Sequence, residues 1–114
     1  MKSLNQVQLI GNVGTDPART EHNGVIISKF SVATGEEWLD KSTTKKVTNS
    51  EWHKVICFNK LAGIVKNYIK KGSKVYVSGK LKTSTWKDKN NENRSTTEII
   101  VDELIMLDRK PNEI

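Results

Sequence analysis

The sequence has few of the residues that crosslink a chain, anchor it in a membrane or carry it out of the cell. Its single cysteine, Cys57, has no partner for an internal disulfide and lies in an apolar run, so we expect a small core residue. No apolar run is long enough to cross a bilayer, and the first residues lack the apolar core of a signal peptide. These absences favour a soluble protein with a cytoplasmic location.

Residues suited to catalysis or metal binding are equally scarce. Of the two histidines, His22 stands in a turn with no cysteine or carboxylate at ligand spacing, so a zinc site has no support. The acids of the first 40 residues are scattered through turns, whereas a two-metal nuclease needs carboxylates that converge from strands. We therefore expect no enzymatic activity, no metal and no cofactor.

Positive charge, in contrast, is abundant and unevenly placed. The chain has a formal net charge of +6 and a pI near 9.5. Residues 41–94 hold fourteen lysines and arginines against three acids, while the rest of the chain holds five against ten. A merely solvated surface would mix its signs more evenly, so the basic middle of the chain indicates a polyanionic partner.

Hydrophobic patterning predicts five strands and one helix. We expect the strands at residues 4–11, 25–34, 51–58, 74–86 and 95–106. The polar stretch 35–50 is typical of a long exposed loop, and 87–93 of a turn. Apolar residues from 61 to 69 recur at helical spacing, which predicts an amphipathic helix over 60–70, capped by Asn59 and closed by Gly72.

This order of elements suggests an all-β domain with one helix. Five strands with the helix between strands 3 and 4 is the layout of a five-stranded Greek-key OB-fold barrel. Another small barrel or an open α+β sheet would satisfy the same periodicity. We expect one domain over residues 1–107, followed by a short polar tail over 108–114.

Alternation along the third strand separates large aromatics from the core. Trp52, Lys54, Ile56 and Phe58 share one face, and the small apolar Val55 and Cys57 share the other. His53 has the parity of the core, where it is either a packed, hydrogen-bonded residue or a subunit contact.

The fourth strand repeats the separation. Lys80, Lys82 and Trp86 share one face, opposite Val77 and Leu81. Exposed aromatics offer stacking platforms to unpaired bases, and lysines between them neutralise phosphates. A duplex hides its base faces, so this pattern favours a single-stranded nucleic acid.

Several segments resemble bacterial single-stranded DNA-binding proteins. They are residues 4–17 (LNQVQLIGNVGTDP), 30–34 followed by Trp38, 51–55 (EWHKV), 71–77 (KGSKVYV) and 96–99 (TTEI). The similarity runs in order over residues 4–107. It implies an OB fold and a homotetramer around which single-stranded DNA wraps during replication, recombination and repair.

The resemblance also implies residue roles, although core packing remains open for Trp38 and simple solvation for the lysines near it. At Ser84 and Thr85 the family has basic residues, a loss for which we expect Lys80 and Lys87 to compensate. The implied stacking positions are Trp38, Trp52, Phe58 and Trp86; the backbone contacts are Lys41, Lys54, Lys60, Lys71, Lys82 and Arg94; the subunit contacts are His53 and Tyr76.

The end of the sequence departs from the family pattern. Typical members continue into a long disordered linker with an acidic tip that recruits repair and replication proteins, whereas this sequence ends at Ile114. We therefore expect DNA coating without tail-mediated recruitment, in a bacterial nucleoid or as a phage- or plasmid-borne protein. A dimeric, primosome-type OB accessory protein is the alternative.

Overall fold

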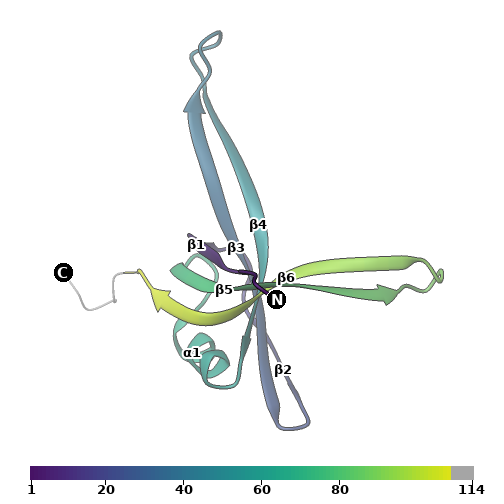
Figure 1. Ribbon diagram of the computed structural model, residues 1–114. Helices are drawn as coiled ribbons and strands as arrows, with labels where there is room; N and C mark the ends of the chain where they lie inside the picture. Colours follow the sequence, from purple (N-terminus) through teal and green to yellow (C-terminus); the bar gives the residue numbers. More distant parts are fainter. Residues whose placement is uncertain (109–114) are drawn as a thin grey trace.

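The computed structural model describes residues 1–108 and contains six strands and one helix (Figure 1). Their order is β1 (Val7–Val13), β2 (Ala18–His22), β3 (Val25–Leu39), β4 (Lys46–Phe58), α1 (Lys60–Tyr68), β5 (Lys74–Lys87) and β6 (Asn93–Met106). The expectation of five strands with the helix between the third and fourth is therefore wrong, because the helix lies between β4 and β5. The unexpected strand is β2, which is exposed throughout and carries no alternation of apolar residues to reveal it.

The strand pairings form a closed circuit of five strands. β1 pairs with β5, β5 with β6, β6 with β4, β4 with β3, and β3 with β1, while β2 lies outside the circuit beside β3. Among the strand pairs of residues 1–108, β4 and β6 run parallel and the others antiparallel. Two glycines allow the strands to approach closely: a Cβ at Gly11 would overlap the carbonyl oxygen of Ala33, and one at Gly79 that of Ile100. Glycine is thus required at these two positions for the strands to approach as they do.

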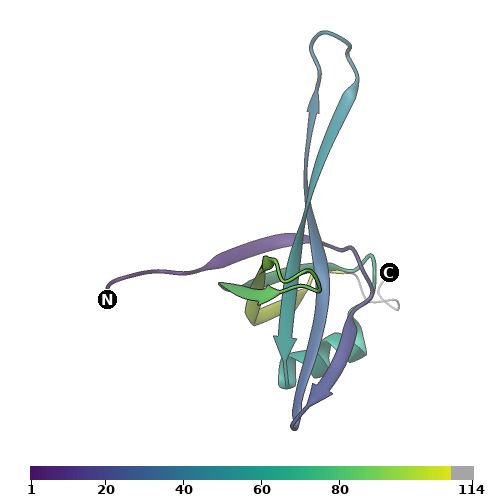
Figure 2. The same cartoon turned by 90° about the vertical axis from the view of Figure 1, so that its right-hand side faces the viewer.

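Two long hairpins project from the body as arms, which we call the β3–β4 arm and the β5–β6 arm (Figure 1). The expected loop over 35–50 is wrong, because β3 and β4 pair without interruption up to Leu39 and Lys46. Figure 2 shows the two strands of this arm crossing as they rise from the body, as expected for a strongly twisted two-stranded ribbon. Its polar residues point to solvent on both sides, so composition alone made it resemble a loop.

The tip of the β3–β4 arm is held by Asp40. Its carboxylate accepts hydrogen bonds from the hydroxyl and the backbone N–H of Ser42, at 2.8 and 2.9 Å. These bonds lower the pKa of Asp40. Thr44, with φ of 56°, completes the reversal.

The helix α1 begins at Lys60, as predicted, but ends earlier than residue 70. Val65 and Ile69 of the predicted apolar stripe are buried, but Tyr68 is 61% exposed, and Ala62, which is not part of the stripe, is fully buried. Asn59 does not cap the helix with its side chain; its Oδ1 instead accepts the Ile26 N–H at 3.2 Å. The helix ends at Tyr68, so Gly72, with φ of 95°, lies in the turn beyond it and is not the helix cap.

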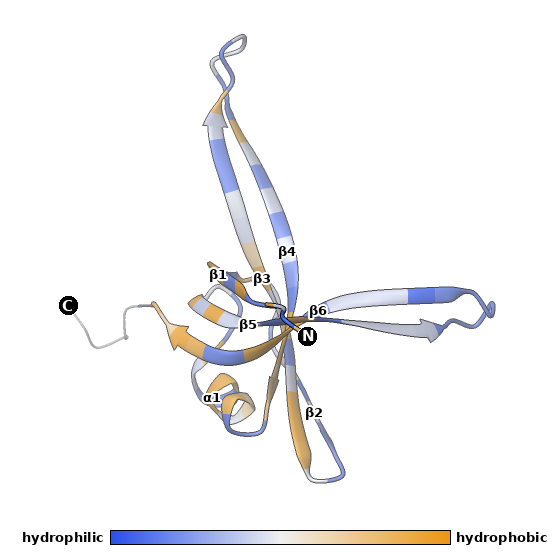
Figure 3. Cartoon of the chain, viewed as in Figure 1, coloured by the Kyte–Doolittle hydropathy of each residue, from blue (hydrophilic) through white to orange (hydrophobic). Residues whose placement is uncertain are grey.

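The core lies inside the closed circuit and beneath α1. Its fully buried side chains are Val13, Val32, Val55, Cys57, Val65, Val75 and Val77. Cys57 is therefore a core residue, as expected, and burial raises the pKa of its thiol to about 12. Figure 3 shows the apolar colouring concentrated on the body and the polar colouring on the arms. Leu81 departs from its predicted core position and is half exposed, because β5 has by then left the body.

Candidate nucleic-acid interface

Side chains that alternate away from the core on β3, β4, β6 and β5 lie on one surface, which we call the outer face. On β4, Trp52, Lys54 and Phe58 are exposed while Val55 and Cys57 are fully buried. Ile56, expected on the face of Trp52, is also buried, at a position where β4 is paired on both sides, with Lys29 and Ile100. Trp52 is 61% exposed and Phe58 37%. The outer face continues from the β3–β4 arm to the β5–β6 arm, because β4 pairs with β6 and β6 with β5. The outer face comprises Lys29, Ser31, Trp52, Lys54, Phe58, Lys80, Lys82, Trp86, Arg94 and Glu98.

Trp86 reaches the same surface from the β5–β6 arm. Alternation along β5 is unbroken, so Lys80, Lys82 and Trp86 all point away from the side that buries Val77. The β-bulge in this ladder lies on β6: Ser78 pairs with Glu103 and Gly79 with Val101, which leaves Asp102 unpaired in the ladder. The face that sequence alternation assigned to Trp86 is therefore the outer face.

Trp38 is not brought to the outer face by the ladder. It pairs with Val47, and alternation places it on the same side of the arm as Val32, whereas Trp52 pairs with Ala33 on the other side. Trp38 is nevertheless 48% exposed, so the alternative of core packing is excluded. It stands near the end of the β3–β4 arm beside the exposed Leu39.

The predicted phosphate-binding lysines fall into three groups. Lys54, Lys80 and Lys82 belong to the outer face. Lys41 lies in the turn of the β3–β4 arm and Lys87 ends β5 in the other arm. Lys60 and Lys71 instead belong to α1 and to the turn beyond it, where the Lys71 backbone N–H donates to Asp16 at 3.0 Å.

Lys29 is an outer-face residue that the sequence analysis missed. It alternates on β3 with Ser28 and Phe30, which are both buried, and its ammonium lies 3.9 Å from the Glu98 carboxylate. The alternation of residues 28–32 would have identified it, had it been applied to this strand as it was to the third and fourth predicted strands.

Arg94 is engaged within its own arm. Its Nε donates to Asp88 Oδ2 at 2.8 Å, and its Nη2 lies 3.6 Å from the Glu92 carboxylate. Asp88 also accepts the backbone N–H groups of Asn90 and Glu92. The Arg94 hydrogen bond, followed by that from Glu92, lowers the pKa of Asp88. The guanidinium that sequence resemblance assigned to DNA thus stabilises the β5–β6 turn in this structure.

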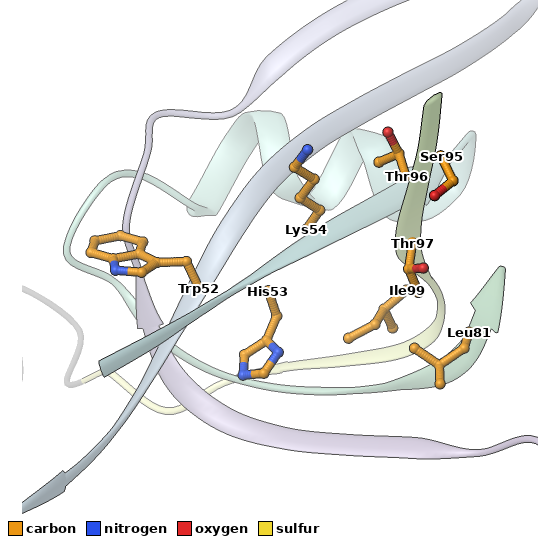
Figure 4. Close-up of a pocket in the computed structure, with 8 residues that line it drawn as sticks. All are labelled: Trp52, His53, Lys54, Leu81, Ser95, Thr96, Thr97 and Ile99. Atoms are coloured by element: carbon orange, nitrogen blue, oxygen red, sulfur yellow. The ribbon is translucent and has the colours of Figure 1, made fainter. Parts of the chain in front are cut away.

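A hollow of about 370 Å³ opens between the two arms (Figure 4). It exists because β4 and β6 pair at only two positions, Val55–Ile99 and Ile56–Ile100, and then diverge. Figure 4 shows Trp52 and Leu81 at its opposite ends. The lining residues are Trp52, His53, Lys54, Leu81, Ser95, Thr96, Thr97 and Ile99.

The two predicted subunit-contact residues are both partly buried and hydrogen-bonded. His53 Nε2 lies 2.9 Å from Thr34 Oγ1, which confirms the expectation of a hydrogen-bonded histidine. The Tyr76 hydroxyl accepts a hydrogen bond from Gln8 Nε2 at 3.1 Å. A subunit contact by either residue stays a prediction.

The part of the chain that the structure describes also bears on metal binding and membrane spanning. Within residues 1–108, no three His, Cys, Asp or Glu side chains gather closely enough to hold a metal ion. The same part of the chain has no helix with the length and apolarity to cross a membrane.

The architecture and the outer face together define a class of protein. A small closed sheet whose exposed aromatics alternate with lysines is typical of an OB-fold domain that binds single-stranded nucleic acid.

Comparison with known proteins agrees with this class. The model of the single-strand binding protein family matches residues 4–107. The chain is 47% identical over 111 residues to single-stranded DNA-binding protein 1 of Xylella fastidiosa, covering 96% of this chain and 82% of that protein. It also resembles the Plasmodium falciparum SSB in complex with single-stranded DNA, with a TM-score of 0.83, 36% identity, and 95% and 98% of the two chains covered.

The chain therefore belongs to the single-strand binding protein family and binds single-stranded DNA. This is a non-catalytic DNA-binding family whose members are tetramers.

Proposed function

We propose that the protein coats single-stranded DNA without strong sequence preference, stacking bases on Trp52, Phe58, Trp86 and Trp38. The observation that carries this proposal is the alternation of exposed aromatics with lysines on the outer face. Every base has a π face, so each platform contributes roughly 1–3 kcal/mol whatever the sequence. Several platforms in use together offset the cost of ordering a flexible strand.

Lysines supply the second part of the proposal by neutralising phosphates. Lys54 stands between Trp52 and Phe58 along β4, and Lys80 and Lys82 precede Trp86 along β5. A phosphate that joins two stacked bases therefore meets an ammonium group at each of these places, and its counterions are released. The supporting lysines beyond the outer face are Lys41, Lys60, Lys71 and Lys87. Arg94 joins them once it leaves Asp88.

We propose a homotetramer with Tyr76 and His53 near its contacts. Ile10, Tyr76 and Ile105 are directly paired across β1, β5 and β6, and both isoleucines are exposed. Exposure of such an apolar row to water is unfavourable, and burial against a second copy would remove that cost. The closed circuit of strands acts as the rigid OB barrel that presents the outer face of each copy.

The cellular role follows from the activity. Unpaired DNA arises in replication, recombination and repair, and a sequence-tolerant coat protects it in each. The bacterial relative supports a cytoplasmic protein that acts at the nucleoid or on phage or plasmid DNA.

A titration with oligo(dT) at low salt, followed by tryptophan fluorescence, tests the proposal. We expect quenching, since stacked bases contact exposed indoles, and a log–log salt slope of roughly −0.7 per neutralised phosphate. A duplex of equal length is the control and should quench far less. Absence of quenching by oligo(dT) would falsify the stacking mechanism, and mass measurement across oligonucleotide lengths gives the stoichiometry of the assembly.

A further inference from the structure

We infer that Gly14 is a positioning residue for base stacking, because its bare backbone is the seat on which the indole of Trp52 lies. The inference rests on the proposed stacking role of Trp52 and adds the group that holds its ring in place.

Gly14 directly follows β1 and is fixed to β3. Its N–H donates to the Ser31 carbonyl at 2.9 Å, and the neighbouring Thr15 Oγ1 accepts the Ser31 N–H at 3.1 Å. Trp52 is paired with Ala33, two residues further along β3. Gly14 and Trp52 thus flank the same stretch of β3, although they are 38 positions apart in the sequence.

The contact between them leaves no room for a side chain at residue 14. A Cβ on Gly14 would overlap Cζ3 of the Trp52 ring, and would lie 2.6 Å from Cε3 and 3.0 Å from Cη2. The six-membered ring of the indole therefore packs directly over Gly14. Because Trp52 is still 61% exposed, the seat covers only part of the ring and leaves surface for a base.

The backbone of Gly14 does not itself require glycine. The glycines with positive φ within residues 1–108 are Gly24 and Gly72, and Gly14 is not among them. An alanine at position 14 is thus compatible with the backbone, and the atoms that must yield are at the far end of the Trp52 side chain. The absence of a side chain at residue 14 therefore matters for the position of the Trp52 ring.

An indole that is already packed against Gly14 binds a base at a lower entropic cost than an indole that moves freely. An exposed tryptophan that samples several rotamers loses that freedom when a base stacks on it, and immobilising a side chain weakens binding measurably. Holding the indole against Gly14 removes part of this cost before DNA arrives.

The test is Gly14→Ala in the full chain, titrated with oligo(dT). We expect binding roughly three- to tenfold weaker than wild type, corrected for the folded fraction. Gly63→Ala is the matched control: a Cβ there meets nothing within 4 Å, so DNA affinity should not change. With Trp38 and Trp86 both replaced by phenylalanine, Gly14→Ala should also shift the emission of the remaining Trp52 in the absence of DNA.

The double variant Gly14→Ala/Trp52→Ala distinguishes an effect of Gly14 on the Trp52 ring from a general loss of binding or stability. If Gly14 acts through the ring, the double variant binds no more weakly than Trp52→Ala alone. If Gly14→Ala alone proves unstable, removing the ring should restore its melting temperature. Wild-type DNA affinity in Gly14→Ala would overturn the inference. So would a double variant that binds DNA more weakly than Trp52→Ala by the full effect of Gly14→Ala, or an unstable Gly14→Ala whose melting temperature is not restored by Trp52→Ala. Failure of wild type to bind oligo(dT) would instead overturn the proposed function.

Discussion

Arg94 and Asp88 are joined at 2.8 Å within the β5–β6 arm, and Arg94 is at the same time the direct ladder partner of Trp86. A cation beside a stacking platform is therefore held by a carboxylate of its own chain. Phosphate and Asp88 compete for the same donor, since the Nε–H that a phosphate would take is already donated.

Replacing Asp88 by asparagine should free Arg94 for DNA. The amide oxygen can still accept the N–H groups of Asn90 and Glu92, so the turn is retained while the ion pair is lost. We expect tighter binding of oligo(dT) at low salt and a log–log salt slope steeper by about 0.7, one more phosphate being neutralised.

Asp40→Asn is the control for this variant. It removes the same charge from the tip of the other arm, where the carboxylate accepts hydrogen bonds from Ser42 and no arginine is involved. Equal slopes in the two variants would show a general charge effect, and weaker binding by Asp88→Asn would mean that Asp88 holds Arg94 ready for DNA.

Trp52→Ala should weaken DNA binding by roughly 1–3 kcal/mol with little loss of stability, because the ring is mostly exposed and stacks on a base. Oligo(dT) titration combined with thermal unfolding measures both effects. Val55→Ala is the contrasting variant: its side chain is fully buried, and the loss of two methyl groups should cost about 2 kcal/mol of unfolding free energy. If Trp52→Ala melted like Val55→Ala and kept its affinity per folded molecule, Trp52 would be a packing residue.

Lys29→Ala should reduce the salt dependence of binding. Lys29 lies on the outer face, and its 3.9 Å approach to Glu98 is too long to fix its exposed ammonium away from phosphate. We expect the log–log slope to become shallower by about 0.7, measured between low and moderate salt. Lys66→Ala, in the last turn of α1, removes the same charge away from the outer face and should leave the slope nearly unchanged.

Cys57 should be chemically silent in the folded protein. Burial raises its pKa to about 12, so at pH 8 the reactive thiolate is only ~10⁻⁴ of the thiol population, in addition to being shielded. A thiol reagent at pH 8 should therefore react at the rate of unfolding and quickly in denaturant. Rapid reaction of the native protein would show that the core around β4 opens far more often than a fully packed core should.

Strand alternation alone predicted which face of its strand each main stacking residue occupies. Trp52 and Phe58 were separated from Val55 and Cys57 by parity alone, and the structure places them on opposite sides of β4 as expected. The rule holds because a strand presents alternate side chains to opposite faces wherever one face is buried. The mostly β character with one helix and the exposure of the main aromatics could thus be predicted from local pattern.

The same rule gave no information where no face is buried. β2 and the outer half of the β3–β4 arm are solvated on both sides, so their sequences show polar composition and no period. Their pairing is decided by β3, which binds β2 through Val25–Lys29 along one edge and β4 through Ile27–Leu39 along the other. The position of Trp38 relative to Trp52 depends on that pairing as well.

Relationships between distant segments were settled only by the tertiary structure. The amino-acid sequence determined which side chains avoid the core and where the positive charge lies. Closure of the sheet decided that Gly14 lies beneath the Trp52 ring and that Lys29 belongs to the outer face. The fold of the β5–β6 turn likewise decided that Arg94 meets Asp88. Periodicity records only the environment of each residue along its own strand, whereas these contacts depend on which strands become neighbours.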